Sequence, residues 1–466
     1  MNPRDNKPAP RALFLGYLLL LLWLPLPLGS NRPLVWAAIE LWVFALAIGW
    51  LVTFWRGNVR IRSVPRAARP VLLCCALWLA YVWFQLLPLP LSLLEILSPE
   101  AARAQIAAAH PLPPGFAPLT LDQYGGLHAA LKSTAYVLFF ALTLVLLDSR
   151  ERIAASAYTL VVSGFLQALY GGIVALNGAA GVVAEGTFVN RNHFAGYLEL
   201  CLAVGLGMLI GNLTGDSAQT WRQFARNVVA LVLSPTMQLR LALVCMVVGL
   251  VLSRSRMGNS AFFASLLVTG AIGLVFSKRA TRSMVILIAS LIVIDIAIVG
   301  TYFGMERVVE RIEQTQMETE RQESVQAVSV WKEFPLFGSG LGSFHIVFPK
   351  YPEHDLGVLY THAHNDYVQF LVETGVVGFT LVGLIVVLSL FAALKAQYLR
   401  GDPLMRGLSF GAIMGIVALM IHSWVDFNLQ IPANAMTFMY VLGLAWISLH
   451  HGREGHAAEA GDKPDD

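Results

Sequence analysis

The stretch His362-Ala-His364-Asn365-Asp366 offers the side chains best suited to acid–base chemistry in this chain of 466 residues. Histidine is the natural general base near neutral pH, and two histidines here compete for that role. Asp366 and Gln369 match the D-x-x-Q pattern of a capping box, and an apolar run follows them. The pattern predicts a helix that begins at Asp366 and fixes His364 at its start.

Two further polar clusters precede apolar runs in the same way. One contains Arg191, Asn192 and His193, and the other contains Arg254 and Arg256. A helix N-terminus presents unpaired N–H groups and a partial positive charge, and guanidinium groups suit phosphate oxygens. If the three helix starts converge, we expect them to bind a polyanion such as a lipid diphosphate. The alternative is a set of unrelated interfacial arginines that snorkel to lipid headgroups.

A metal site is a second interpretation of the histidines. His362 and His364, together with His345 or His354, could supply ligands. No carboxylate or cysteine completes a recognisable spacing, so we expect no metal and no cofactor. A purely structural role for His364 is the remaining alternative.

Acidic residues within apolar runs must face the protein interior or a wet cavity. They are Glu40, Glu199, Asp295 and Glu373. Their scatter along the chain predicts no paired acid–base relay of the kind a proton-coupled transporter uses. We expect Glu373 to form a structural bond to a neighbouring helix. A weaker polar cluster runs from His422 through Asp426 to Asn428.

Composition indicates what positions these side chains. Hydrophobic residues make up 56% of the chain and charged residues only 13%, with a mean hydropathy of +0.64. Soluble domains carry about 25% charged residues, so most of this surface faces something other than water. Runs of about 20 apolar residues, enough to cross a bilayer as a helix, recur along the whole chain. The sequence predicts an all-α polytopic membrane protein.

About twelve membrane-spanning helices are predicted from these runs. They lie at 12–29, 34–55, 70–91, 127–147, 153–177, 193–213, 238–253, 258–277, 283–303, 367–394, 407–423 and 433–449. The chain then divides into four regions. Residues 1–303 hold spans one to nine and a loop at 92–126, and residues 304–366 form a large loop. Residues 367–450 hold spans ten to twelve, and residues 451–466 form a tail. We expect a short interfacial helix in the loop at 92–126. In the large loop we expect an amphipathic helix from Glu306 to about Lys332, followed by a glycine-rich turn.

The positions of the basic residues predict the orientation. With the N-terminus in the cytoplasm, about two thirds of the 32 Lys and Arg residues fall in cytoplasmic segments. This arrangement places both termini in the cytoplasm, and we expect the membrane to be the inner membrane of a bacterium. The loops at 92–126 and 304–366, and the three polar clusters, are then periplasmic.

From His364 to Gly378 the sequence resembles the O-antigen ligase and polymerase superfamily. The signature is His-Asn, then an aromatic residue or leucine, then Glu-x-Gly-x-x-Gly, which here begins at Glu373. Weaker likenesses are the glycine-rich run 335–344, Ser255-Arg256 at the head of a helix, and Arg191 after the fifth span. The resemblance covers the twelve-span layout and, most specifically, residues 185–380.

The resemblance implies a metal-independent, inverting glycosyltransferase of GT-C-like architecture. The donor would be a glycan on undecaprenyl diphosphate. The acceptor would be the lipid A core in a ligase, a lipid-linked glycan in a polymerase of polysaccharide biosynthesis, or a protein hydroxyl in an O-oligosaccharyltransferase. A transporter or flippase for lipid-linked sugar is the alternative without chemistry; no nucleic-acid partner is expected.

The resemblance also implies roles for the residues of the polar clusters. His364 would deprotonate the acceptor hydroxyl, while Arg191 and Arg256 would hold the diphosphate. Arg254 stands beside Arg256, which leaves open which of the two contacts phosphate. Asn192 would join the diphosphate site. The supporting residues would be His193, His362, Asn365, Asp366 and Glu373.

Overall fold

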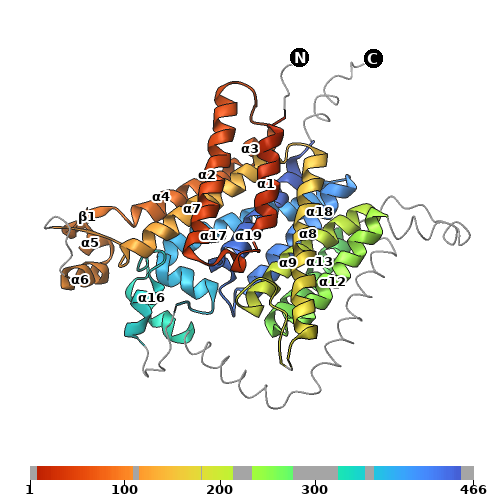
Figure 1. Cartoon of the computed structure of the whole chain (residues 1–466). Helices are drawn as coiled ribbons and strands as arrows, with labels where there is room; N and C mark the ends of the chain where they lie inside the picture. The colour runs from red at the N-terminus through yellow and green to blue at the C-terminus, as the bar shows by residue number, and fades with distance from the viewer. Residues whose placement is uncertain are drawn as a thin grey trace, which may run out of the picture.

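The computed structural model describes residues 8–108, 115–179, 181–213, 234–276, 324–351 and 361–452, which form a bundle of helices (Figure 1). The predicted all-α membrane architecture is confirmed at this level, because eight of the described helices are long and apolar enough to cross a membrane. The predicted span at 283–303 and most of the large loop lie outside the described residues, as does the tail from 453 onward. The count of twelve spans therefore stays a prediction.

A helix of at least 13 residues lies in every predicted span that the structure describes. They are α1 (Arg11–Trp23), α2 (Pro33–Trp55), α4 (Arg69–Phe84), α7 (Gln123–Leu146), α8 (Arg150–Asn177), α9 (Arg191–Leu213), α12 (Pro235–Leu252), α13 (Arg256–Phe276), α17 (Asp366–Leu399), α18 (Pro403–His422) and α19 (Pro432–His450). The shorter elements are α3 (Ser63–Ala67), α5 (Leu91–Leu97), α6 (Pro99–Ala107), α16 (Phe344–Val347), η2 (Leu28–Ser30), η3 (Phe348–Lys350), η4 (Asn428–Gln430), β1 (Pro88–Pro90) and β2 (Phe116–Pro118).

Two helices end earlier than predicted. α1 has 13 residues and α4 has 16, whereas the apolar runs at 12–29 and 70–91 predicted full spans. Pro25 and Pro27 follow α1, and Pro88 follows α4. Proline lacks the N–H that an α-helix needs and clashes with the preceding turn, so the helix stops while the apolar run continues. An apolar run alone therefore overestimates the length of these helices.

The centre of the bundle is formed by α9, α18 and α19, which are the most deeply buried of the long helices. α9 and α18 approach so closely that glycines are required at their contact. A Cβ at Gly411 would lie 2.6 Å from the carbonyl oxygen of Ala203. Small residues allow such close backbone contact between membrane helices, where packing and not the hydrophobic effect drives association.

The two predicted long loops pack together into a small separate layer. β1 pairs antiparallel with β2, and α5 and α6 lie beside this pair. Their apolar side chains share a core with Val330, Phe344 and Phe348 from the large loop. Where one short helix was predicted within the loop at 92–126, the structure has α5, α6 and β2, and β2 pairs with β1 just before the loop. Residues 324–333 are helical, as predicted, and the remainder of that predicted amphipathic helix lies outside the described residues.

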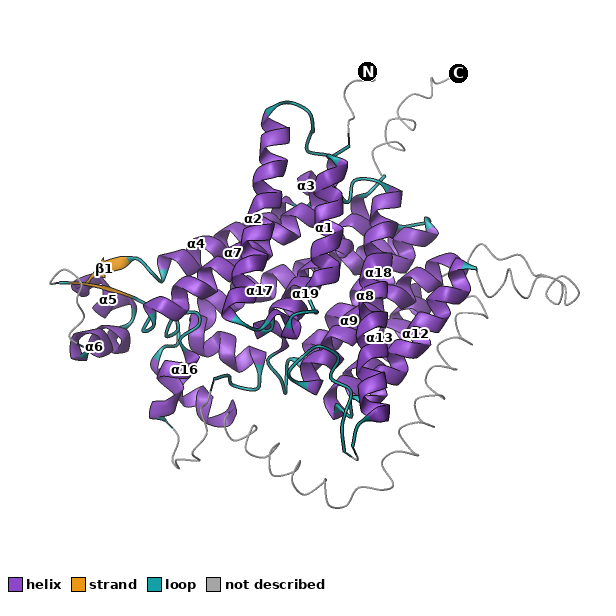
Figure 2. Cartoon of the chain, in the orientation of Figure 1, coloured by secondary structure: helices purple, strands orange, loops and turns teal. Residues whose placement is uncertain are grey.

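The connections between the long helices lie at two opposite ends of the bundle (Figure 2). At one end Arg62 pairs with Asp148 at 3.4 Å, and Arg400 donates to the carbonyl oxygen of His451. At the other end are the residues before α9, α13 and α17 and the loop between α18 and α19. Among the connections that the structure describes, those predicted to be cytoplasmic lie at the first end and those predicted to be periplasmic lie at the second. The assignment of the ends to the two sides of a membrane stays a prediction.

Candidate functional site

The starts of α9, α13 and α17 converge on the loop at 423–431 between α18 and α19. The α9 start reaches this loop through His193, whose ring lies 4.6 Å from that of Phe427. The α17 start reaches it through the backbone N–H of Asp366, which donates to the carbonyl oxygens of Ser423 and Asp426. The first turns of α13 and α9 touch, because a Cβ at Gly258 would lie 2.5 Å from that of Ala195.

Histidine rings surround Phe427 on several sides. The ring of His362 stacks on it at 4.3 Å, and the ring of His364 meets it edge-on at 4.9 Å. His193 approaches from α9, also edge-on. The structure therefore brings both predicted candidates for the base and the predicted supporting residue His193 around one buried phenyl ring. Phe427 could not be identified from the sequence, except by its position in the weak polar cluster.

The conformation of His364 is unusual for a residue with a side chain. Its φ is +48°, in the left-handed region, and the next residue caps α17. Asn365 accepts a hydrogen bond from the backbone N–H of Val368 (3.1 Å) and donates to the carbonyl oxygen of Trp424 (2.8 Å). The predicted capping box at Asp366 and Gln369 is therefore wrong, because the N-cap is Asn365 and Asp366 is the first helical residue.

Asp366 instead fixes the loop after α18. Its carboxylate accepts hydrogen bonds from the hydroxyl of Ser423 (2.9 Å), the backbone N–H of Leu429 (3.0 Å) and the side-chain amide of Gln430 (3.3 Å). Gln369 contacts His362 at 3.2 Å and donates to Glu373 at 3.2 Å. These side chains of α17 tie the histidine segment to the elements on either side of it.

Glu373 forms a structural bond, as predicted, but its partner is the glycine-rich run at the start of the short helix α16 and not a neighbouring long helix. Its carboxylate accepts hydrogen bonds from the backbone N–H groups of Gly342 (3.0 Å) and Phe344 (3.3 Å). α17 is broken two residues later at Gly375, where φ is +59° and ψ is −170°. The carbonyl of Glu373, which the break releases, accepts from the N–H of Gly340 at 2.9 Å. The Glu-x-Gly motif is thus the point where the glycine-rich run inserts into a broken helix.

The predicted arginines lie at the same end of the bundle. Arg191 and Asn192 begin α9, immediately before His193, and Arg256 begins α13. Arg254 lies between α12 and α13 with a φ of +53°, in the left-handed region. Burial raises the pKa of Glu185, and the nearby charge of Arg191 opposes that rise.

Two groups next to Phe427 have strongly shifted pKa values. Burial, together with the neighbouring His193 and His364, lowers the pKa of His362 to about 3, although a hydrogen bond from the ring to Gln369 opposes the shift. Burial alone would raise the pKa of Asp426, but His193 and His422 lower it to about 2. At neutral pH, His362 is therefore uncharged and Asp426 is ionised.

A buried acid–histidine chain, which the sequence did not predict, lies behind these residues. His422 and Glu199 form a hydrogen bond of 2.8 Å within the bundle. The other ring nitrogen of His422, Nε2, faces Asp426 at 3.6 Å, and Asp426 faces His193 at 3.5 Å. The expectation of scattered, unpaired acids is wrong for Glu199. The pairing joins residues more than 200 positions apart, so spacing along the sequence could not reveal it.

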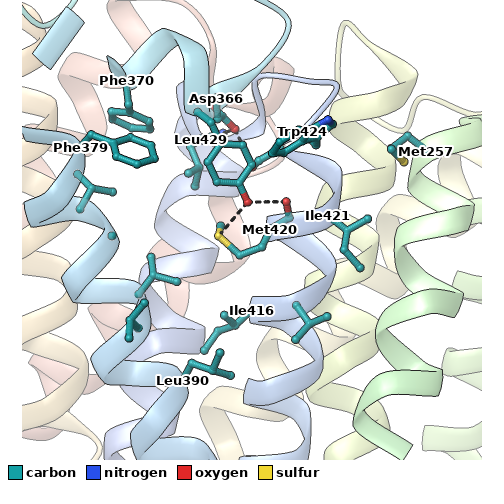
Figure 3. Close-up of a pocket in the computed structure, with 17 residues that line it drawn as sticks. Met257, Asp366, Phe370, Phe379, Leu390, Ile416, Met420, Ile421, Trp424 and Leu429 are labelled. Atoms are coloured by element: carbon teal, nitrogen blue, oxygen red, sulfur yellow. Dashed lines mark hydrogen bonds between the residues drawn. The ribbon is translucent and has the colours of Figure 1, made fainter. Parts of the chain in front are cut away.

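An apolar cavity of about 680 Å³ opens beside this site, between α17 and α18 (Figure 3). Its polar end is formed by Asp366, Ser423 and Trp424, and Met257 of α13 contributes to its wall. From there it extends along the apolar faces of α17 and α18 to Leu390. A long apolar chain with a polar head is the kind of ligand that fits such a cavity.

Comparison with known protein families shows that part of the chain matches one of them. Residues 241–383 match the family described as O-antigen ligase, and no curated protein matches the chain. The matched segment holds Arg254, Arg256, the glycine-rich run and the motif from His364 to Gly378, whereas Arg191 and Asp426 lie outside it. Residues 241–383 are therefore similar to the O-antigen ligase family, and they lie within a bundle of membrane-type helices.

Proposed function

We propose that this protein transfers a glycan from undecaprenyl diphosphate to an acceptor hydroxyl at the periplasmic face of a bacterial inner membrane. Both termini lie in the cytoplasm in this proposal, with the site at the opposite end of the bundle. The observation that carries the proposal is the convergence of three helix starts on a histidine-lined loop, beside an apolar cavity. The family match to O-antigen ligases supports it independently.

The donor would bind across the polar and apolar parts of the site. Arg191 and Arg256, each at the first position of a helix, would hold the diphosphate with their guanidinium groups and the helix N-termini. Arg254 and Asn192 would add further donors. Met257 follows Arg256 and lines the apolar cavity, so a lipid held at Arg256 would have its polyprenyl chain directed along α17 and α18.

His364 would serve as the general base. A group whose pKa lies near the working pH accepts a proton best, and the pKa of about 3 makes His362 a weak acceptor. His364 is partly exposed beside the same phenyl ring. Its left-handed backbone conformation directs the residue out of the start of α17, a kind of strain that is often found at functional sites.

The reaction would be a single displacement with inversion at the anomeric carbon. The acceptor O–H bond breaks and its proton passes to His364, while the acceptor oxygen forms the new bond to the sugar. The bond from the sugar to the diphosphate breaks, and its electron pair stays on the departing phosphate oxygen. Preorganised cations that meet this developing charge lower the barrier. The proposal uses no metal, because a diphosphate is already an activated leaving group.

The principal rival is a flippase that uses the same cationic site without chemistry. Release of undecaprenyl diphosphate separates the two, because this product forms with every acceptor class and never in transport. In membranes that contain the lipid-linked glycan, we expect the wild-type protein to release it and His364→Ala to release none. Arg191→Ala and Arg256→Ala should raise the donor KM. Donor movement across the bilayer without any release would refute the proposal.

The identity of the acceptor distinguishes the enzymes within the superfamily. A lipid A core points to a ligase, a second lipid-linked glycan to a polymerase, and a serine or threonine to a protein O-oligosaccharyltransferase. A deletion strain that is complemented with this gene would show which acceptor becomes glycosylated. Loss of glycan from that acceptor in the His364→Ala strain is the expected control result.

A further inference from the structure

Glu199, His422, Asp426 and His193 form a row of four buried ionisable side chains, which is called the acid–histidine chain here. The side chains of Glu199 and His422 are fully buried, and those of Asp426 and His193 are 2% and 7% exposed. Ionisable groups within a membrane bundle are costly and are retained mainly where they have a function. Carboxylates and imidazoles alternate in space along this row of four, and the described residues contain no other continuous row of this kind.

The acid–histidine chain has oxygen and nitrogen atoms that could bind an additional proton. Asp426 lies between two imidazoles, with its two carboxylate oxygens facing Nε2 of His193 and Nε2 of His422. Four buried atoms of this acid–histidine chain have no hydrogen-bond partner among the described residues: Nε2 of His193, Oδ2 of Asp426, Nε2 of His422 and Oε2 of Glu199. A buried polar atom without a partner is destabilising, and a proton shared along the chain would satisfy these atoms.

One end of the chain reaches the proposed site. His193 packs against Phe427, as do His362 and His364, so the chain ends beside the proposed base. Asp366 of α17 adds a further carboxylate near Asp426 and His422. Lys132 of α7 is a nearby cation, whose charge acts on His362 and on Glu373. The other end, at Glu199 of α9, is buried between α13 and α18: a Cβ at Gly258 of α13 would lie 3.3 Å from Oε1 of Glu199, and His422 of α18 bonds to the same atom.

We propose that His193, Asp426, His422 and Glu199 form a proton-holding chain that takes up the proton released from the acceptor hydroxyl. This inference rests on the proposed transferase function. His364 receives the proton as the new glycosidic bond forms, and the proton then passes by way of solvent to His193 and on toward Glu199. The chain returns the proton to solvent before the next acceptor binds, so no net proton remains in the protein. Glu199, His422 and Asp426 are thus positioning residues that act through His193 and His364.

Two substitutions test the proton-holding role and retain hydrogen bonding. Glu199→Gln can still accept a hydrogen bond from His422, and His422→Gln can still donate one to Glu199, but neither side chain can carry a proton. We expect each to lower kcat for undecaprenyl diphosphate release at least about tenfold and to shift the pH–rate profile. The KM for the donor should not change. The solvent deuterium isotope effect on kcat should rise as proton removal limits the rate.

Glu40→Gln is the matched control, because Glu40 is a buried carboxylate of α2 that also has an oxygen without a hydrogen-bond partner. It should retain the wild-type rate and pH profile. If His422→Gln does not fold, Asp426→Asn provides the same test, because Asp426 lies in the loop after α18 and not within a helix. Wild-type kinetics in Glu199→Gln together with loss of activity in His364→Ala would overturn the proton chain and leave the transferase function intact. No release by the wild-type protein would overturn both.

Discussion

Gly375 provides the most quantitative test of how the site is assembled. Its φ of +59° and ψ of −170° lie in a region that is populated almost only by glycine. A Cβ at this position would lie 2.6 Å from the backbone nitrogen of Phe337 and closer still to the carbonyl of Leu336. Because both neighbours are backbone atoms, no side-chain rotation can relieve the contact. We therefore expect Gly375→Ala to displace the glycine-rich run from the break in α17.

The cost of this displacement follows from the contacts. A residue forced into this backbone region costs about 1–3 kcal/mol. The N–H groups of Val376 and Val377 donate to the carbonyls of Pro335 and Leu336 at 2.9 Å and 3.2 Å. The loss of these two bonds adds about 0.5–1.5 kcal/mol each. The free energy of unfolding should therefore fall by about 2–6 kcal/mol in total.

An unfolding titration in mixed micelles measures this change. Gly383→Ala is the matched control, because Gly383 lies on the same helix with nothing within 4 Å of an added Cβ. In a regular helix the alanine should stabilise by about 0.5–1 kcal/mol. Equal stability of the two variants would refute the interpretation of the Glu-x-Gly motif as a backbone insertion site.

Other predictions follow from single contacts. Asp366→Ala removes the acceptor for Ser423 and the N–H of Leu429, so it should lower the free energy of unfolding by about 2–4 kcal/mol. Asp366→Asn keeps an acceptor oxygen, so in the same titration it should cost less than half as much; equal losses would contradict this role. Phe427→Ala should lower stability by about 3–5 kcal/mol and reduce undecaprenyl diphosphate release, because it removes the ring on which three histidines pack. Phe427→Leu should recover stability more than it recovers activity, and full recovery of both would show that the ring does not position the histidines. The pKa of His362 is about 3 in the folded protein and about 6.5 in the unfolded chain, so only the unfolded chain binds this proton between these values. Stability should therefore fall as pH drops below about 6.5, by up to about 1.4 kcal/mol per pH unit, and His362→Gln should flatten that slope. An identical slope in His362→Gln would contradict the shifted pKa.

The membrane architecture could be predicted from the sequence because it depends on local composition. Apolar runs of helical length predicted where the helices lie. The density of basic residues in successive connections divided these connections into two groups, and the described members of the two groups lie at opposite ends of the bundle. The proline-terminated ends of α1 and α4 were missed because hydropathy does not register a missing backbone donor. The break at Gly375 was missed for a related reason, since the freed carbonyls are satisfied by a run more than 30 residues away.

The candidate site was predictable only in part. His364, Arg191 and Arg256 could be identified from residue type, from their positions before helices and from the resemblance. The true cap at Asn365 differs from the predicted box by one residue, because Asp366 serves a tertiary role that no local pattern reveals. The pairing of Glu199 with His422 and the clustering of rings around Phe427 depend on how distant helices pack. Neither has a signature in the spacing of the residues concerned.

A structure of the protein with undecaprenyl diphosphate would test the central claim most directly. The account predicts that the diphosphate lies within about 3 Å of the guanidinium groups of Arg191 and Arg256, at the joined starts of α9 and α13. The polyprenyl chain should occupy the cavity between α17 and α18. A diphosphate bound elsewhere, or held at a distance from His364 that no acceptor hydroxyl could bridge, would contradict the account.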